Sequence, residues 1–84
     1  MNTRLMKAEL LCTIEKFPSL KEKITSLFNN NDEFQSLCRD YFFCVKSLGQ
    51  WEMSVEKDET FLRQYKESKM TLENELLHYV KIKT

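Results

Sequence analysis

The residues of this 84-residue sequence best suited to nucleophilic or metal chemistry are few: three cysteines and a single histidine, His78. A thiol becomes an effective nucleophile when a base such as histidine lies within hydrogen-bond reach of it. If the second half of the chain folds as a helical hairpin, Cys38 comes level with Leu76, close in sequence to His78. At about 100° per residue, however, His78 points about 140° away from the inward stripe of its helix. We therefore expect no Cys38–His78 pair and assign no catalytic residue.

A metal site is the second chemical possibility. Glu75-Leu-Leu-His78 matches the Glu-x-x-His half-motif of di-iron helical bundles, in which both ligands project inward. His78 is expected to point outward, so the motif is incomplete. Cys38 and Cys44 lie about 120° apart around a helix, so one zinc ion would not readily bind both. The sequence therefore predicts no metal and no cofactor, and the cysteines are expected to pack as small apolar residues.

The charge balance and the apolar runs argue against several classes of partner. Thirteen basic and thirteen acidic residues give a net charge of zero, whereas non-specific nucleic-acid binding needs a basic excess. No apolar run approaches the roughly 20 residues of a membrane span, and Glu9 and Glu15 interrupt anything resembling a signal peptide. An odd number of cysteines suits a reduced protein. We expect a cytoplasmic protein that binds no nucleic acid, no membrane and no small-molecule substrate.

Residues 1–31 are expected to form two short helices. The first starts after Thr3 and ends near Lys16, because Pro18 lacks an N–H and clashes with the preceding turn. Ser19-Leu-Lys-Glu22 has the form of a capping box, which predicts that the second helix starts there. Asn29-Asn-Asn31 favours turn conformations and is expected to end it.

Residues 32–84 are expected to form a long antiparallel helical hairpin. Asp32 with Gln35 three residues later is a second capping signal, and a polar turn is expected at Ser54–Glu59. Apolar residues recur every three or four positions on both arms, as on helices that pack along a neighbour. The inward positions are Phe34, Leu37/Cys38, Tyr41, Cys44/Val45, Leu48, Trp51 and Val55 on the first arm, and Leu62, Tyr65, Leu72, Leu76 and Tyr79/Val80 on the second.

The two arms can be aligned level by level around the turn. An antiparallel hairpin brings together residues whose numbers sum to about 113 if the turn is centred near residues 56–57. The paired levels are Phe34 with Tyr79, Tyr41 with Leu72, and Leu48 with Tyr65. Two residues within these patterns are unusual. Lys69, at an inward position, is expected to pack its stem and keep its ammonium in water. Gly49, inside the pattern of the first arm, suggests a close helix contact or a kink.

The predicted fold is therefore all-α. It is a small helical bundle in a single domain, residues 1–84, built on the hairpin of residues 32–84 with the two shorter helices of residues 1–31. Phe42 and Phe43 do not fit the hairpin seam, since Phe43 points about 160° from its centre. Either the N-terminal helices fold back and bury both rings, or the rings form an interface with another subunit or a partner.

A further pattern runs through the chain: Phe34-Gln-Ser-Leu37-Cys38-Arg-Asp40-Tyr41, then Leu48 and Trp51, then Tyr65 and Glu73-Asn-Glu75. This pattern resembles that of a group of small uncharacterised bacterial helical proteins. The likeness spans roughly residues 17–80. The resemblance implies an all-α fold and a bacterial, cytosolic origin. It implies no activity, so Cys38 and Asp40 gain no role from it.

The leading functional hypothesis is a non-enzymatic module for protein–protein interaction or self-assembly, with Phe42 and Phe43 as the candidate interface. It predicts a dimer or larger species. The first alternative is a metal- or thiol-dependent enzyme of the four-helix-bundle type, which would need bound metal or an accessible, acidic Cys38. The second is a small regulator that associates with nucleic acid, which would bind DNA in a salt-sensitive way.

Overall fold

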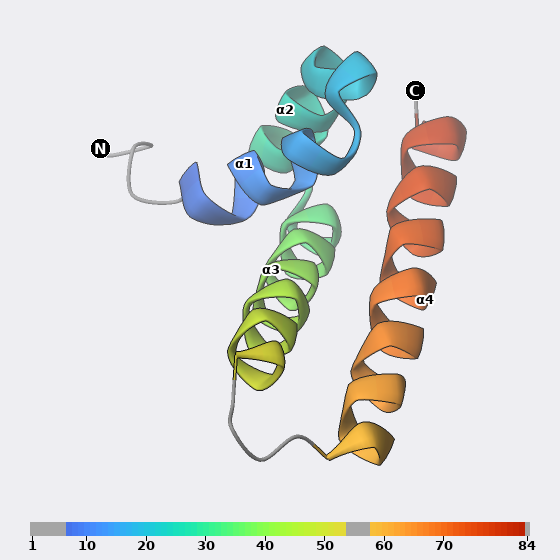
Figure 1. Cartoon of the computed structure of the whole chain (residues 1–84). Coiled ribbons are helices and arrows are strands. Elements are labelled where there is room, and N and C mark those ends of the chain that lie inside the picture. Colours follow the sequence, from blue (N-terminus) through green and yellow to red (C-terminus); the bar gives the residue numbers. More distant parts are fainter. Residues whose placement is uncertain (1–6, 54–57, 84) are drawn as a thin grey trace.

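The computed structural model describes residues 7–53 and 58–83 of the chain, and its described elements are helices (Figure 1). They are α1 (Lys7–Lys16), a single 3-10 turn η2 (Pro18–Leu20), α2 (Lys21–Asn30), α3 (Asp32–Glu52) and α4 (Glu59–Lys83). The predicted all-α fold is confirmed. None of the described helices is long and apolar enough to cross a membrane.

Helices α3 and α4 lie side by side and antiparallel, which confirms the predicted hairpin (Figure 1). The ring centroids of Phe34 and Tyr79 are 5.6 Å apart, at the level expected from the sequence. Farther along, the Tyr41 hydroxyl meets Glu73, the neighbour of the expected Leu72. The side-chain contacts therefore agree with the predicted register to within one residue at these two levels. The third predicted pair, Leu48 with Tyr65, is wrong: the Cys44 thiol donates to the Tyr65 carbonyl at 3.3 Å, so Tyr65 meets Cys44 instead.

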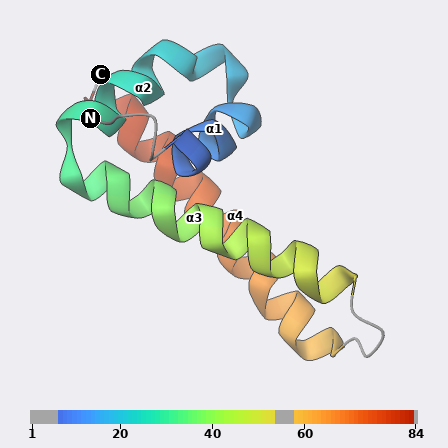
Figure 2. The same ribbon diagram turned by 90° about the vertical axis from the view of Figure 1, so that its left-hand side faces the viewer.

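Helices α1 and α2 pack over only one end of this hairpin, as Figure 2 shows. The buried apolar cluster draws on every helix. Its buried members are Leu10, Ile24, Leu27, Phe28, Phe34, Cys38, Tyr41, Leu76 and Val80. On the hairpin these residues come from the beginning of α3 and the end of α4. We call residues 43–53 and 58–70 the distal half of the hairpin. Val45, near its start, still packs against this cluster, and the rest of the distal half extends toward the turn, past α1 and α2 (Figure 2).

The first predicted capping box is wrong. Pro18 opens the η2 turn directly after Phe17, because its ring holds φ near the helical value. Ser19 therefore already lies inside a helical turn and cannot cap one. Helix α2 begins at Lys21, and the residue before it, Leu20, makes no side-chain cap hydrogen bond.

The second predicted cap is displaced by one residue. Asn31, with extended backbone, is the N-cap of α3, and its side-chain oxygen accepts a hydrogen bond from the backbone N–H of Phe34 at 3.0 Å. Gln35 instead donates to the carbonyl of Phe28 at 2.7 Å. This bond occupies one of the carbonyls that the end of α2 leaves without a helical partner. Gln35 thus joins α2 to α3 across a one-residue connection.

The expected turn is described only at its edges. Helix α3 ends at Glu52, and Asp58 caps α4 by accepting hydrogen bonds from the backbone N–H groups of Thr60 at 2.9 Å and Phe61 at 3.3 Å. Glu59, expected in the turn, is the first residue of α4. Residues 54–57, including the expected inward position Val55, lie outside the described residues, as does the expected start of the first helix.

The expectation of a close contact at Gly49 is also wrong within the described chain. A Cβ added there would meet no atom within 4 Å, and α3 runs unbroken past this position. Glycine in a helix costs about 0.5–1 kcal/mol relative to alanine through backbone entropy. We therefore expect Gly49→Ala to raise the free energy of unfolding by up to about 1 kcal/mol, measured by urea denaturation of dilute protein. A loss of stability would show that something in the chain does approach Gly49.

Candidate functional site

The structure places Cys38 and His78, the two residues considered for nucleophilic chemistry, in different environments. Cys38 is completely buried on α3, whereas His78 is exposed on α4. The Cys38 thiol shares a hydrogen bond with the side chain of Thr13, a buried residue of α1. Burial raises the pKa of Cys38 to about 11, with the Thr13 bond opposing the shift only in part. At neutral pH this side chain is a protonated thiol in the core.

Thiol chemistry gives a direct check on this arrangement. With the core intact, we expect Cys38 to react with a thiol reagent much more slowly than Cys12, which is only partly buried. Burial raises the pKa of Cys12 as well, so accessibility, not acidity, should separate the two rates. Mass mapping of the labelled sites against time would measure both rates, and denatured protein provides the control. Equal rates in the folded chain would contradict a buried Cys38.

The half-motif considered for a di-iron site does not form a ligand set. Glu75 and His78 are both exposed on α4. Within residues 7–53 and 58–83, no group of three or more histidine, cysteine or acidic side chains is placed to hold a metal ion. Glu75 and His78 instead line a shallow groove with Leu37 and Tyr79 on the surface of the hairpin.

The two candidate interface rings differ in exposure. Phe43 is 56% exposed, whereas Phe42 is half-buried. Their ring centroids lie 5.9 Å apart, and the Lys46 ammonium lies 5.9 Å from the centre of the Phe42 ring. Since α1 and α2 cluster with Phe34 and the residues that share its face, the interpretation that they bury both rings is wrong for Phe43.

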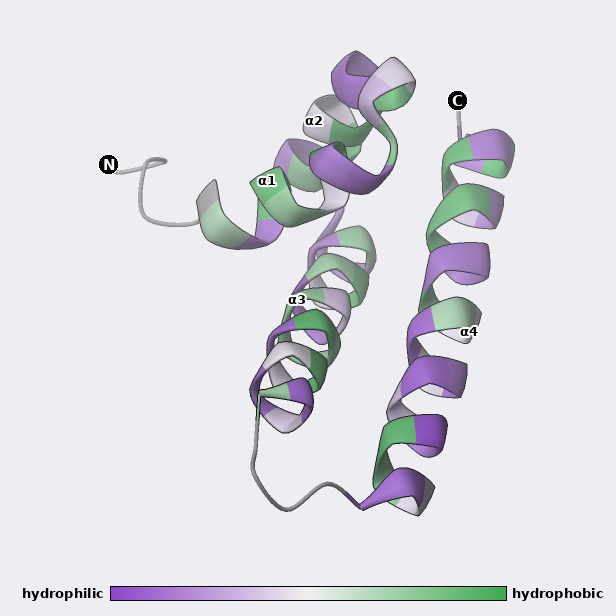
Figure 3. Ribbon diagram, viewed as in Figure 1, coloured by the Kyte–Doolittle hydropathy of each residue, from purple (hydrophilic) through white to green (hydrophobic). Residues whose placement is uncertain are grey.

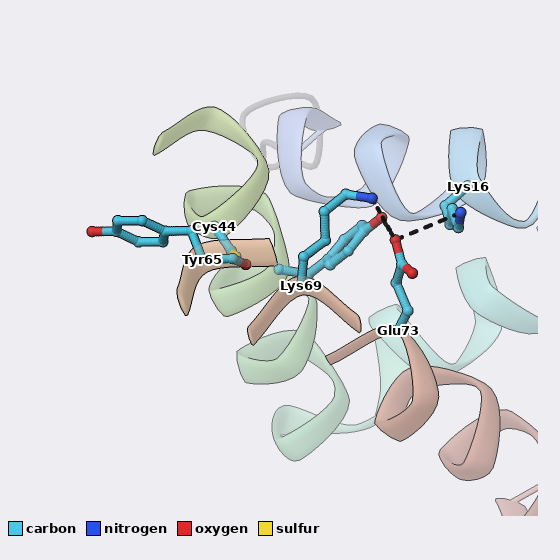
Figure 4. Close-up of polar contacts among 6 residues, drawn as sticks. Lys16, Cys44, Tyr65, Lys69 and Glu73 are labelled. Carbon is cyan, nitrogen blue, oxygen red and sulfur yellow. Dashed lines mark hydrogen bonds and ion pairs between the residues drawn. The ribbon is translucent and has the colours of Figure 1, made fainter. Parts of the chain in front are cut away.

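A polar cluster that the sequence did not reveal lies between α1, α3 and α4 (Figure 4). One carboxylate oxygen of Glu73 accepts hydrogen bonds from the Tyr41 hydroxyl and the Lys69 ammonium, each at 2.8 Å. The Lys16 ammonium of α1 lies 3.6 Å from the same oxygen. The expectation that the Lys69 ammonium stays in water is therefore wrong. The i, i+4 spacing of Lys69 and Glu73 was the signal that could have found this pair.

The cluster has a defined protonation state. Burial alone would raise the pKa of Glu73, but the hydrogen bonds from Lys69 and Tyr41 outweigh it and hold that pKa below its ordinary value. Burial and the bond to Glu73 raise the pKa of Tyr41, so the phenol stays protonated and donates. The cluster joins three helices through one carboxylate. Each of its polar side chains has its hydrogen-bond or ion-pair partner within the cluster, which is typical of a structural contact and not of a reactive site. We call this cluster of Lys16, Tyr41, Lys69 and Glu73 the clasp.

A groove opens between α3 and α4 beside this cluster, at the beginning of the distal half. Its volume is about 530 Å³. Its apolar floor consists of Val45, Leu48, Gly49 and Met70, and its charged rim consists of Glu52, Lys66, Lys69 and Glu73. The groove thus combines a hydrophobic strip with charges of both signs.

The distal half exposes much of the apolar surface of the described chain. The described residues include six exposed large hydrophobic side chains: Leu11, Phe43, Met53, Phe61, Met70 and Ile82. Four of these six belong to the distal half, where only Cys44 and Leu48 are buried. In Figure 3 the ribbon of α3 keeps its hydrophobic segments beyond the part that α1 covers. The hairpin is therefore apolar along more of its length than α1 and α2 can cover.

No family model, no curated protein and no solved structure matches this chain, so its function has to be inferred from its own residues.

Proposed function

We propose that this chain is a non-enzymatic protein-interaction module that docks through the distal half of its hairpin. The observation that carries the proposal is the uneven cover of the hairpin. The other end of the hairpin, at the beginning of α3 and the end of α4, has a core to which α1 and α2 contribute. The distal half buries only Cys44 and Leu48. The exposed rings and thioethers there include Phe43, 56% exposed, and Met70, 62% exposed.

The physical reason is the way helices bury apolar surface. Each helix hides one stripe against a neighbour, and a stable domain needs at least a second layer over that stripe. Toward the turn, beyond Val45, which still packs against the core cluster, α3 and α4 extend past α1 and α2 (Figure 2). A further helical surface laid over the groove would remove Val45, Gly49 and Met70 from water. Such burial contributes roughly 25 cal/mol per Å² of apolar surface.

The chemical alternatives receive less support. A thiol enzyme would need Cys38 to be accessible and acidic, yet it is buried and its pKa is raised. A nucleic-acid regulator would need a basic surface, yet the net charge is zero and α3 begins with Asp32 and Glu33. The three free cysteines suit a reducing compartment, which supports the cytoplasmic setting that the sequence favours.

Two matched positions on α4 allow the proposal to be tested. Met70 in the distal half and Ile82 near the end of the helix are 62% and 60% exposed. A photocrosslinking amino acid would be placed at one or the other in the full chain, expressed in its native host. Crosslinked products would then be resolved by mass. We expect discrete adducts from position 70 and few from position 82, because only the first lies on the proposed surface.

The matched pair controls for exposure and for the helix that carries the probe. Adducts of equal yield from both positions would indicate random collision. The absence of adducts from position 70 would overturn the docking function, whether the missing partner is a foreign protein or a second copy.

A further inference from the structure

We infer that a second copy of this chain covers the distal groove, related to the first by a two-fold axis that sets Glu52 of each copy against Lys66 of the other. This inference rests on the proposed function, because it names the partner of the same surface. It follows from the charges on the rim and from the shape of the floor.

The rim carries two charges that no described residue of the chain pairs. Glu73 and Lys69 bond to each other at 2.8 Å. Glu52, on α3, and Lys66, on α4, line opposite sides of the groove, and neither forms an ion pair with any residue that the structure describes. Among residues 7–53 and 58–83, each groove therefore offers one acid and one base without an ion-pair partner.

Glu52 is also badly placed for its own helix. It is the last residue of α3, and the last turn of that helix contains no basic residue. A negative charge is unfavourable at a helix C-terminus because the helix dipole is negative there. A cation supplied from outside the chain would relieve this, which is the role that Lys66 of a second copy would take.

A two-fold axis between two copies would form the Glu52–Lys66 contact twice, once on each side of the axis. In such an interface the same patch meets itself, so that a contact of residue i with residue j is repeated as j with i. One acid and one base on opposite sides of a groove then give two Glu52–Lys66 pairs. A single-sign rim would repel its own copy. The net charge of zero means that two copies meet without overall repulsion.

The floor of the groove suits an approaching helix. Val45, Leu48 and Met70 supply apolar contact, and a Cβ at Gly49 would meet nothing within 4 Å. A helix of the second copy can therefore come close to the backbone of α3 at Gly49. Two hairpins joined in this way form four antiparallel helices around a shared core, which is the arrangement of four-helix bundles. The distal half would then have the second layer that it lacks alone.

Charge exchange tests both the partner and the axis. Sedimentation velocity would measure dimer dissociation for the wild type, E52K, K66E, the double variant E52K/K66E, and an equimolar mixture of the two single variants. Either single change replaces two attractive pairs by two repulsive ones, so we expect Kd to rise at least about tenfold. In the double variant and in the mixture every pair is again attractive, so we expect association within about threefold of the wild type.

The controls separate folding from association. Glu75→Lys, at an exposed position in the middle of α4, makes the same charge change away from the groove and should leave Kd unchanged. Circular dichroism of each variant would verify its helix content. Lysine is favoured at a helix C-terminus, so E52K should not weaken α3 itself.

The outcomes distinguish this inference from the proposed function. Recovery of association in the mixture would support the two-fold pairing, because a foreign partner cannot produce it. A wild-type dimer that is insensitive to both single changes would overturn the two-fold pairing. A strictly monomeric wild type, combined with photocrosslinks from position 70 to another protein, would overturn the second copy as partner and leave the docking function standing.

Discussion

Replacement of Phe34 by alanine is expected to lower the free energy of unfolding by about 3–5 kcal/mol. The ring is completely buried, lies 5.6 Å from the ring of Tyr79 and belongs to the cluster to which every helix contributes. Truncation removes its apolar burial and leaves a cavity that rigid neighbours fill only in part. Domains are stable by only about 5–15 kcal/mol, so this loss approaches the whole stability of a chain this short.

The same helix provides a matched control for this prediction. Phe43 is 56% exposed, so Phe43→Ala should change the free energy of unfolding of dilute protein by no more than about 0.5 kcal/mol. Urea denaturation followed by circular dichroism would measure both variants. Similar losses for the two phenylalanines would mean that the core is not where the structure places it.

Replacement of Glu73 by alanine is expected to cost about 1–3 kcal/mol at neutral pH. The change leaves the Tyr41 hydroxyl, in a residue only 2% exposed, without its acceptor. It also removes the 2.8 Å ion pair to Lys69 and the weaker contact with Lys16. Glu75→Ala, two positions away on the exposed surface of α4, is the control and should be nearly neutral.

The cost of Glu73→Ala should also depend on pH. The pKa of Glu73 is lowered in the folded chain, so its charge stabilises the fold above the unfolded value of about 4.3. That contribution is lost as the pH falls through the lower, folded pKa. Urea denaturation at neutral and at acid pH should show the difference between wild type and variant shrinking in acid. A difference independent of pH would contradict an ionised Glu73 in the clasp.

The hairpin could be predicted from the sequence because its signals are local and repeated. Apolar residues recur along α3 and α4 at helical spacing, and only one alignment sets Phe34 against Tyr79. The same geometry separated Cys38 from His78. Helix ends were predicted less well, because neighbouring polar residues compete for one cap. Asn31, and not Asp32, is the N-cap of α3, and the Gln35 side chain donates to the Phe28 carbonyl of α2 instead of capping its own helix.

The polar cluster around Glu73 and the groove could not be predicted, because they depend on tertiary contacts that no local sequence pattern encodes. Glu73 is a surface residue by type and becomes a clasp only because Tyr41 of α3 and Lys16 of α1 approach it. The sequence identified Phe42 and Phe43 as rings that the hairpin seam cannot bury. It did not show how far α1 and α2 would reach along the hairpin, so the groove at Gly49 and Met70 emerged only from the structure.

We propose that the distal half of the hairpin is incomplete until another molecule covers it. Amide hydrogen exchange on dilute protein tests this directly, because exchange reports the opening free energy of each segment. We expect the amides of residues 44–50 and 62–70 to exchange at least about tenfold faster than those of residues 34–41 and 72–80. The difference should narrow as the protein concentration rises. Equal protection of both halves in dilute protein would mean that the distal half is complete without a partner.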